Sequence, residues 1–322
     1  MDDRLLLHRA DWANGTVDIG GVTYKLNDTV LPTVDFRDPY ALSPGEEQVV
    51  SQLVLTFRRS SKLQEHVRFL MDKGAMYRVC NGNLLYHGCV PMKPDGSFTE
   101  MNIEGKCYGG KALMDVCDRL VRTANYDRKC ANTDFMWYLW CGPKSPLNGK
   151  DKIATFERTF ISDKAAGVET KDAYYELWNN TETAEAILED FGVDPQRGHI
   201  INGHVPVKKS KGETPVKAGG KFINIDGGLS KAYQPVTGIC GYTLVFNSHQ
   251  MYLAEHQPFD PDTAFKRQTD MLSRKIMIEQ FPERLRVKDT DGGKLLEQRI
   301  HDLNQLLCAY RSGVVRAPER TV

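Results

Sequence analysis

The chain has 322 residues, 41% of them hydrophobic, which is enough to bury a sizeable core in one large domain or two small ones. Lys plus Arg and Asp plus Glu both number 42, so no overall field favours nucleic acid or an anionic membrane as a partner. No run approaches the roughly 18 apolar residues of a membrane span, and the first four residues lack signal-peptide character, so we expect a cytoplasmic protein.

The first 60 residues begin with an apolar run and then predict a hairpin and a helix. Leu5–His8 is an apolar, strand-like run with no turn or polar tail before it. A hairpin is expected from residues 16–19 and 22–26, which flank two glycines. Ser43 opens a capping box with Glu46 and begins a helix.

The next segments predict a second helix, a hairpin and a third helix. Ser61 with Gln64 opens the second helix, Gly74 closes it, and its apolar face is expected to pack on a core. That face consists of Leu63, Val67, Leu70 and Met71. Asn81-Gly82 is the strongest hairpin signal and joins strands 76–80 and 83–86. The apolar spacing over 109–126 is helical.

An aromatic segment, 134–140, precedes a rigid polar loop, 141–147. Aromatic residues at this density usually form core, but with Lys144 and Ser145 beside them they could also wall a sugar-phosphate pocket. Helices are expected near 171–178 and 181–191. The basic loop 208–212, which begins with Lys208, is a solvated turn or a source of positive potential for a phosphate.

The last third of the chain is expected to hold a three-stranded meander and two amphipathic helices. The strands are 222–228, 241–247 and 250–255, and the helices are 262–281 and 293–310. The eight cysteines include no Cys-x-x-Cys pair, and pairs such as Val79-Cys80 and Ile239-Cys240 are apolar. We therefore expect reduced core cysteines rather than disulfides or a zinc knuckle.

Two strands end in similar polar motifs that contain a histidine. His87 and Gly88 follow the apolar run 84–86, and Gly203 and His204 follow the strand around 200–202. A single histidine at a strand end is more often a hydrogen-bonded structural residue. Two in matching contexts suggest imidazoles that share one metal ion, since neutral imidazole is the commonest side-chain metal ligand.

The strings around these histidines resemble the class III fructose-1,6-bisphosphatases of bacteria. They are Gly82-Asn83-Leu84-Leu85-Tyr86-His87-Gly88-Cys89-Val90-Pro91 and His199-Ile200-Ile201-Asn202-Gly203-His204-Val205-Pro206-Val207-Lys208. Further strings agree in order, namely residues 1–8, 38–42, 140–142, 145–147 and 225–230. The resemblance covers nearly the whole chain.

That family is similar to the calcineurin-like metallophosphatases, so the resemblance implies a mixed α/β (α+β) fold, the C-terminal half of a β-sandwich flanked by helices. It implies hydrolysis of fructose 1,6-bisphosphate to fructose 6-phosphate and phosphate, a step of gluconeogenesis, at a binuclear Mn²⁺ site. His87 and His204 match two metal ligands on one ion. Lys144, Ser145, Lys208 and Asp226 are expected substrate-binding residues.

The sequence also departs from the family pattern. It contains no Asp-x-His, no Gly-Asp-x-x-Asp-Arg and no Gly-Asn-His, which supply the remaining ligands and the general acid. We therefore expect a C-terminal half that starts at an internal methionine. The expected parts are a remnant over 1–60, the half metallophosphatase domain over 61–257 and a helical tail over 258–322.

Three functions stay open. The chain is a phosphatase that works with a separately encoded N-terminal half, a non-catalytic truncated remnant, or a regulatory metal-binding module. A homo-oligomer is also left open.

Overall fold

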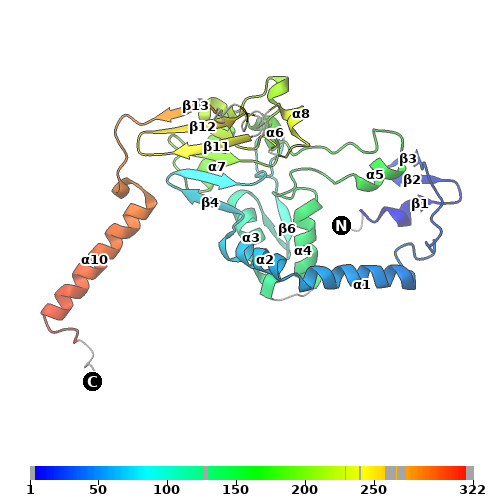
Figure 1. The fold of residues 1–322 in the computed structure, drawn as a ribbon, viewed down its shortest axis with the longest axis horizontal. Helices are drawn as coiled ribbons and strands as arrows, with labels where there is room; N and C mark the ends of the chain where they lie inside the picture. The colour runs from blue at the N-terminus through cyan, green and yellow to red at the C-terminus, as the bar shows by residue number, and fades with distance from the viewer. Residues whose placement is uncertain are drawn as a thin grey trace. The chain divides into compact units, whose positions relative to one another are not determined.

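The computed structural model describes residues 4–126, 130–228, 230–238, 241–257, 266 and 273–316. By their contacts these residues group into two units (Figure 1). Unit 1 comprises Met1–Tyr77 and Tyr86–Thr183, and unit 2 comprises Arg78–Leu85 and Ala184–Val322. The three-part division at residues 60 and 257 stays a prediction.

Unit 1 begins with small elements. The strand-like reading of Leu5–His8 is wrong, because the 3₁₀ helix η2 (Leu6–Arg9) occupies this run. The predicted hairpin is confirmed as β2 (Thr16–Ile19) and β3 (Val22–Lys25), and β1 (Ala10–Asp11) adds a third antiparallel strand. These strands pack with α5 (Thr155–Phe160) around Val17, Leu26 and Ile161.

The predicted helices of unit 1 are present. Helix α1 (Pro44–Arg59) starts at Ser43 with both bonds of the capping box, and α2 (Ser61–Lys73) ends at Gly74. The N-cap of α2 is Ser60, one residue before the predicted one. No residue of α2 within the described chain is buried and Leu70 is 64% exposed, so the expected packing of this face on a core is wrong.

The remaining elements of unit 1 include a helix with one buried face. Helix α3 (Gly110–Tyr126) buries Leu113, Val116, Cys117 and Leu120, as its spacing predicts. The hairpin β6 (Met101–Ile103) and β7 (Lys106–Tyr108) precedes it. The aromatic segment lies in α4 (Cys130–Cys141), and α6 (Tyr174–Leu177) follows. Helix α7 (Thr181–Asp190) begins at the end of unit 1 and continues into unit 2 from Ala184.

Unit 2 is built on a five-stranded sheet in the order β4-β5-β8-β10-β9. Its strands are β4 (Tyr77–Cys80), β5 (Asn83–Tyr86), β8 (His199–Asn202), β9 (Val216–Lys217) and β10 (Phe222–Asn224). Asn81 and Gly82 both have positive φ, 49° and 76°, which is the type I′ geometry that the Asn-Gly signal predicts. The short helices η3 (Lys209–Lys211) and η4 (Ala218–Gly220) lie between β8 and β10.

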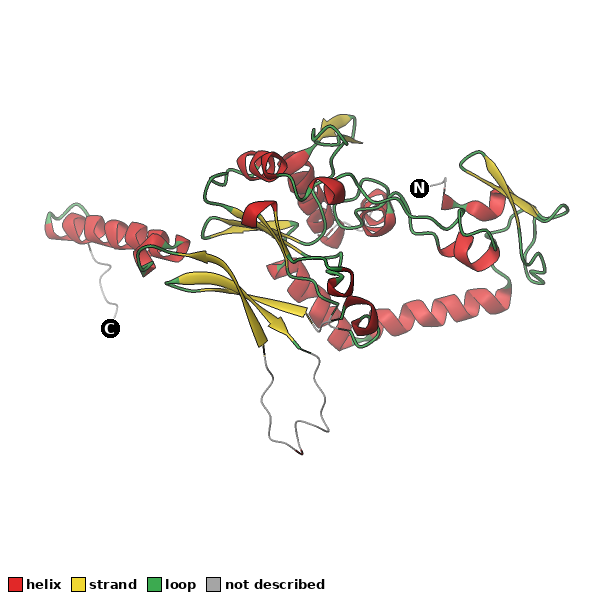
Figure 2. Cartoon of the chain, turned by 90° about the horizontal axis from the view of Figure 1, so that it is seen from above, coloured by secondary structure: helices red, strands yellow, loops and turns green. Residues whose placement is uncertain are grey.

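A second sheet of unit 2 contains β11 (Gly241–Phe246), β12 (Gln250–His256) and β13 (Ser273–Gln280), which lie side by side (Figure 2). The predicted meander is therefore wrong in its first member, because Phe222–Asn224 pairs with β8 and β9 instead. The predicted helix 262–281 is wrong over 273–280, because this segment pairs with β12. Residues 258–265 and 267–272 lie outside the described part.

One hydrophobic core joins the two sheets of unit 2. Ile201 and Ile223 of the first sheet contact the same cluster as Tyr242, Met251 and Leu253 of the second. Side chains of two sheets that share a core produce a sheet-on-sheet arrangement. The mixed α/β fold class is confirmed, and the half metallophosphatase sandwich stays a prediction.

The remaining elements of unit 2 are helical. They are α8 (Gln234–Thr237), η5 (Val287–Asp289) and α10 (Asp291–Arg311). The final predicted helix is thus confirmed. The cysteines whose side chains are described, residues 80, 89, 107, 117, 141 and 308, are free thiols. Cys89 and Cys117 are buried as predicted, but Cys107 and Cys308 are exposed, so the expectation of core cysteines is wrong for these two. Ile239-Cys240 lies outside the described residues.

Candidate functional site

The two strands that precede the histidines are neighbours in the five-stranded sheet. Strands β5 and β8 run parallel, with Leu85 opposite Ile201. His87 comes two residues after Leu85, and His204 comes three residues after Ile201. Ligand-binding residues in parallel sheets typically follow the carboxyl ends of the strands.

His204 has an unusual backbone. Its φ is +66°, and the N–H of Val205 donates to the carbonyl of Gly203 at 2.8 Å, which closes a three-residue γ-turn around the histidine. A non-glycine residue at this φ is strained, and such strain concentrates at functional sites. The half-buried His204 is therefore held in a backbone conformation that costs free energy.

Two buried asparagines lie beside this turn, and one of them, Asn224, bonds to it. Asn202 and Asn224 end the parallel strands β8 and β10 in matching register and are 2% and 1% exposed. The side-chain amide of Asn224 donates to the carbonyl of Val205 at 2.8 Å, and its oxygen accepts the N–H of Asp226 at 2.9 Å. Sequence reasoning missed both residues, although the shared ending Ile-Asn of the two strands was a readable signal.

Asp226 lies in the loop after β10 and helps to hold the loop that follows His204. Its carbonyl accepts the N–H of Val207 at 2.8 Å, and its carboxylate accepts the N–H of Gly228 at 2.9 Å. Asp226 is half-buried. The structure thus gives it a role in joining the loops after β8 and β10, and its predicted contact with substrate stays a prediction.

Two lysines of the basic loop after His204 bond to glutamates of the protein, which a solvated turn would not require. The backbone N–H of Lys208 donates to the carboxylate of Glu213 at 2.9 Å. The ammonium of Lys209 forms an ion pair with Glu255, whose side chain is only 3% exposed. Glu255 in turn is one cause of the rise in the pKa of Tyr242 to about 12, after burial.

Replacing Lys209 with alanine should destabilise unit 2, because it leaves the buried carboxylate of Glu255 without its cation. A half-exposed partner reduces the usual cost of breaking a buried pair to about 1–3 kcal/mol. Thermal unfolding of Lys209→Ala should show this loss. Lys211→Ala, an exposed lysine of the same loop, is the matched control, and equal melting of the two variants would remove the structural role of Lys209.

The segment after β5 lies against the polar loop of unit 1. A Cβ atom at Gly88 would lie 2.3 Å from the carbonyl oxygen of Pro146, and the N–H of Cys89 donates to that oxygen at 3.0 Å. Only glycine permits this approach. Backbone therefore passes close to Gly88, and the side chain of His87 beside it is exposed.

The two residues predicted from the polar loop differ in character. Ser145 is fully buried, donates its hydroxyl to the carbonyl of Leu139 at 2.5 Å and accepts the N–H groups of Leu147 and Asn148. It therefore stabilises the loop. Lys144 is exposed and has a φ of +61°. The predicted contacts of Lys144 and Ser145 with substrate stay predictions, and of the two side chains only that of Lys144 is exposed.

Cys89, two residues after His87, is fully buried, as expected for a reduced core cysteine. Burial raises the pKa of its thiol well above the ordinary value, and the nearby Asp172 adds to the rise. Burial also raises the pKa of Asp172, whose carboxylate accepts the N–H of Met92 at 2.9 Å.

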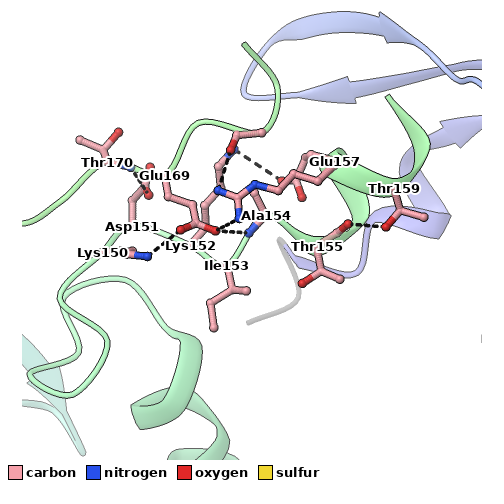
Figure 3. A network of polar contacts seen from close by, with 12 residues as sticks. Lys150, Asp151, Lys152, Ile153, Ala154, Thr155, Glu157, Thr159, Glu169 and Thr170 are labelled. Atoms are coloured by element: carbon pink, nitrogen blue, oxygen red, sulfur yellow. Dashed lines mark hydrogen bonds and ion pairs between the residues drawn. The ribbon is translucent and has the colours of Figure 1, made fainter. Parts of the chain in front are cut away.

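A separate ion-pair network in unit 1 surrounds two glutamates (Figure 3). Glu157 is fully buried and pairs with Arg4 at 3.0 Å and Lys152 at 3.5 Å. Glu169 pairs with Lys150 at 2.8 Å and Arg158 at 3.0 Å. Burial opposes ionisation of Glu169, but hydrogen bonds from Lys150 and the backbone of Ala154 outweigh it and lower its pKa.

The described residues do not provide a complete set of ligands for a metal ion. Within the described residues, no group of three or more His, Cys, Asp or Glu side chains could hold a metal ion. Two imidazoles without carboxylates leave most coordination positions to water, and Mn²⁺ prefers oxygen ligands. These residues do not by themselves fit a binuclear manganese site.

The model of the family described as Firmicute fructose-1,6-bisphosphatase matches residues 1–312 of the chain. The chain belongs to this family. The predicted resemblance is thereby confirmed, and the family is one of phosphoric monoester hydrolases.

Curated relatives agree with this family. The class 3 fructose-1,6-bisphosphatase of Clostridium novyi (strain NT) is 48% identical over 98% of this chain and 48% of its own length. That of Bacteroides fragilis (strain YCH46) is 50% identical, again over 98% and 48%. That of Clostridioides difficile (strain 630) is 46% identical over 98% and 49%. The chain thus spans about half the length of the curated relatives it matches.

No solved structure matches the chain. Across the described ranges, no helix combines the length and the apolar character that crossing a membrane requires.

Proposed function

We propose that this chain takes part in the hydrolysis of fructose 1,6-bisphosphate to fructose 6-phosphate and phosphate, with His87 and His204 as ligands of one Mn²⁺ ion. Family membership supports the reaction. The observation that carries the site is the γ-turn at His204, because a strained histidine after a buried strand is typical of a functional position.

The substrate would be recognised by local positive charge, since the chain has no net charge. Lys144 is exposed and Lys208 half-buried, and both are available on loops. Asp226 would act by fixing the loop that carries Lys208. The carboxylates that complete the metal site would come from residues that this sequence does not contain, and the two-sheet core of unit 2 supports a half metallophosphatase sandwich.

The proposal predicts negligible hydrolysis of fructose 1,6-bisphosphate by the 322-residue chain alone, even with manganese. Addition of the N-terminal half of the Clostridium novyi relative should produce turnover, because that half would supply the missing acidic ligands. Phosphate release from fructose 1,6-bisphosphate is the measurement. A His87→Ala, His204→Ala double variant in the same mixture is the control.

Two outcomes would contradict the proposal. Turnover by the lone chain that survives chelation of metal would show that these histidines are not ligands of an essential ion. An inactive mixture whose two halves nevertheless bind one another would favour the non-catalytic or regulatory alternative.

A further inference from the structure

Helix α10 carries an apolar seam that the described chain leaves exposed. The seam consists of Leu296, Ile300, Leu303, Leu307 and Tyr310, which are between 41% and 64% exposed. Their spacing of four, three, four and three residues is the heptad repeat of a coiled coil. Within the described stretch 273–316, only Gly293 of α10 is buried.

The helix is nonetheless well specified at both ends (Figure 1). Thr290 caps its start by accepting the N–H of Gly293 at 3.0 Å. Its end is a Schellman motif, in which Gly313, at a φ of +74°, donates to Tyr310 and Val314 donates to Ala309. The exposed seam therefore belongs to a defined helix and not to a frayed segment.

The start of α10 is also fixed to the sheet of unit 2. The N–H of Asn81 donates to the carboxylate of Asp291 at 2.6 Å, and the N–H of Asp291 donates to the side chain of Asn81 at 3.0 Å. This reciprocal pair joins the β4–β5 turn to the first residue of the helix. A partner that binds the seam therefore binds a helix whose first residue is fixed to the sheet of unit 2.

We propose that the seam of α10 binds α10 of a second copy of this chain, with the two helices antiparallel. In this arrangement Ile300 of one copy lies opposite Tyr310 of the other, and Leu303 lies opposite Leu307. The two-fold axis repeats both layers, so four apolar layers form the core. Leu306 then lies opposite Leu306 of the second copy and adds apolar contact beside the axis, while Leu295 lies off the seam.

Charge decides the orientation. In the antiparallel arrangement Glu297 of each copy lies opposite Arg311 of the other, which gives two equivalent ion pairs beside the core. A parallel arrangement places Arg299 opposite Asn304 and Leu306 opposite Arg311, with no attraction in either pair. The sequence of α10 therefore complements itself in one direction only.

The interface is short, and its affinity should be modest. Leu296 to Tyr310 spans about 21 Å at 1.5 Å per residue, which is only two heptads. Contacts outside the seam are not needed for the arrangement. We expect a monomer–dimer equilibrium in the micromolar range.

Sedimentation of the full chain at increasing concentration tests the proposal. The chain should form dimers, Leu303→Glu should abolish them, and Glu297→Arg should weaken them at least tenfold by placing two guanidinium groups opposite each other. The double variant Glu297→Arg, Arg311→Glu should restore the dimer. Asp302→Arg is the matched control, since it makes the same charge change on the outer face and should have no effect.

Cysteine cross-linking tests the orientation independently. A mixture of Glu297→Cys and Arg311→Cys chains should form the mixed cross-link in preference to either cross-link between identical variants. A chain that stays monomeric, a dimer indifferent to Leu303→Glu, or a failure of the double charge reversal would overturn the proposal. Dissociation of the dimer when the N-terminal half of a relative is added would also overturn it, because the seam would then belong to another part of the enzyme.

Discussion

The His204→Gly variant is expected to lose more than about 100-fold in turnover while unit 2 becomes no less stable. Even residues that only support a metal ligand typically cost 10–100-fold, so loss of the ligand itself should cost more. Glycine adopts a φ of +66° without strain, which should offset the lost side-chain contacts by up to about 1 kcal/mol. Turnover with the N-terminal half of a relative and thermal unfolding of the variant measure the two effects.

Glu104→Gly provides the matched control, because Glu104 is exposed and has a similar φ of +54° in the β6–β7 turn. It should gain the same conformational relief and keep full activity. A His204→Gly variant with normal turnover would remove His204 from the site. A strongly destabilised His204→Gly variant would instead show that the turn is held by its side chain.

The Glu157→Ala variant is expected to show the largest loss of stability. Glu157 is fully buried, and its removal leaves the guanidinium of Arg4 and the ammonium of Lys152 largely buried without their shared carboxylate. Breaking such a pair costs about 3–5 kcal/mol, which lowers the melting temperature of a unit of this size by roughly 10 °C. Calorimetry of the full chain is the measurement.

Arg37→Ala supplies the comparison for this effect. Arg37 pairs with Asp35 at 2.8 Å, but the arginine is almost wholly exposed, so its removal should change the melting temperature little. Hydrogen bonds from Arg37 lower the pKa of Asp35 to about 2, and this shift should disappear in the variant. If Glu157→Ala and Arg37→Ala melt alike, the buried network does not stabilise unit 1.

Local signals predicted the local structure well. The capping box at Ser43, the Asn81-Gly82 turn and the C-terminal glycine of α2 each depend on a few neighbouring residues, and all are present. The spacing of apolar residues in α3 likewise matches its buried face. Such features could be predicted because their physical cause lies within one turn of the chain.

Features that depend on distant partners could not be predicted. Residues 273–280 form a strand because they pair with the edge of β12. The alternation of Ile276 and Ile278 with the exposed Met277 fits a strand, but it did not by itself exclude a helix. Phe222–Asn224 pairs with β8 rather than β11. In both cases the tertiary partner, not the intrinsic preference of the segment, selects the structure.

The same limit applies to the site. The sequence identified His87 and His204 as residues of the right chemistry, and their role as metal ligands stays a prediction. It could not show that the hydroxyl of Ser145 and the ammonium of Lys209 are engaged inside the protein. Whether a polar group is available depends on neighbours far away in the chain.

The close approach of Pro146 to Gly88 also bears on how this segment can vary. No side chain fits at position 88, so geometry alone excludes every other amino acid there. Position 87 carries an exposed side chain and meets no such restriction. Steric exclusion should therefore prevent substitution at position 88, whereas it does not restrict the side chain at position 87.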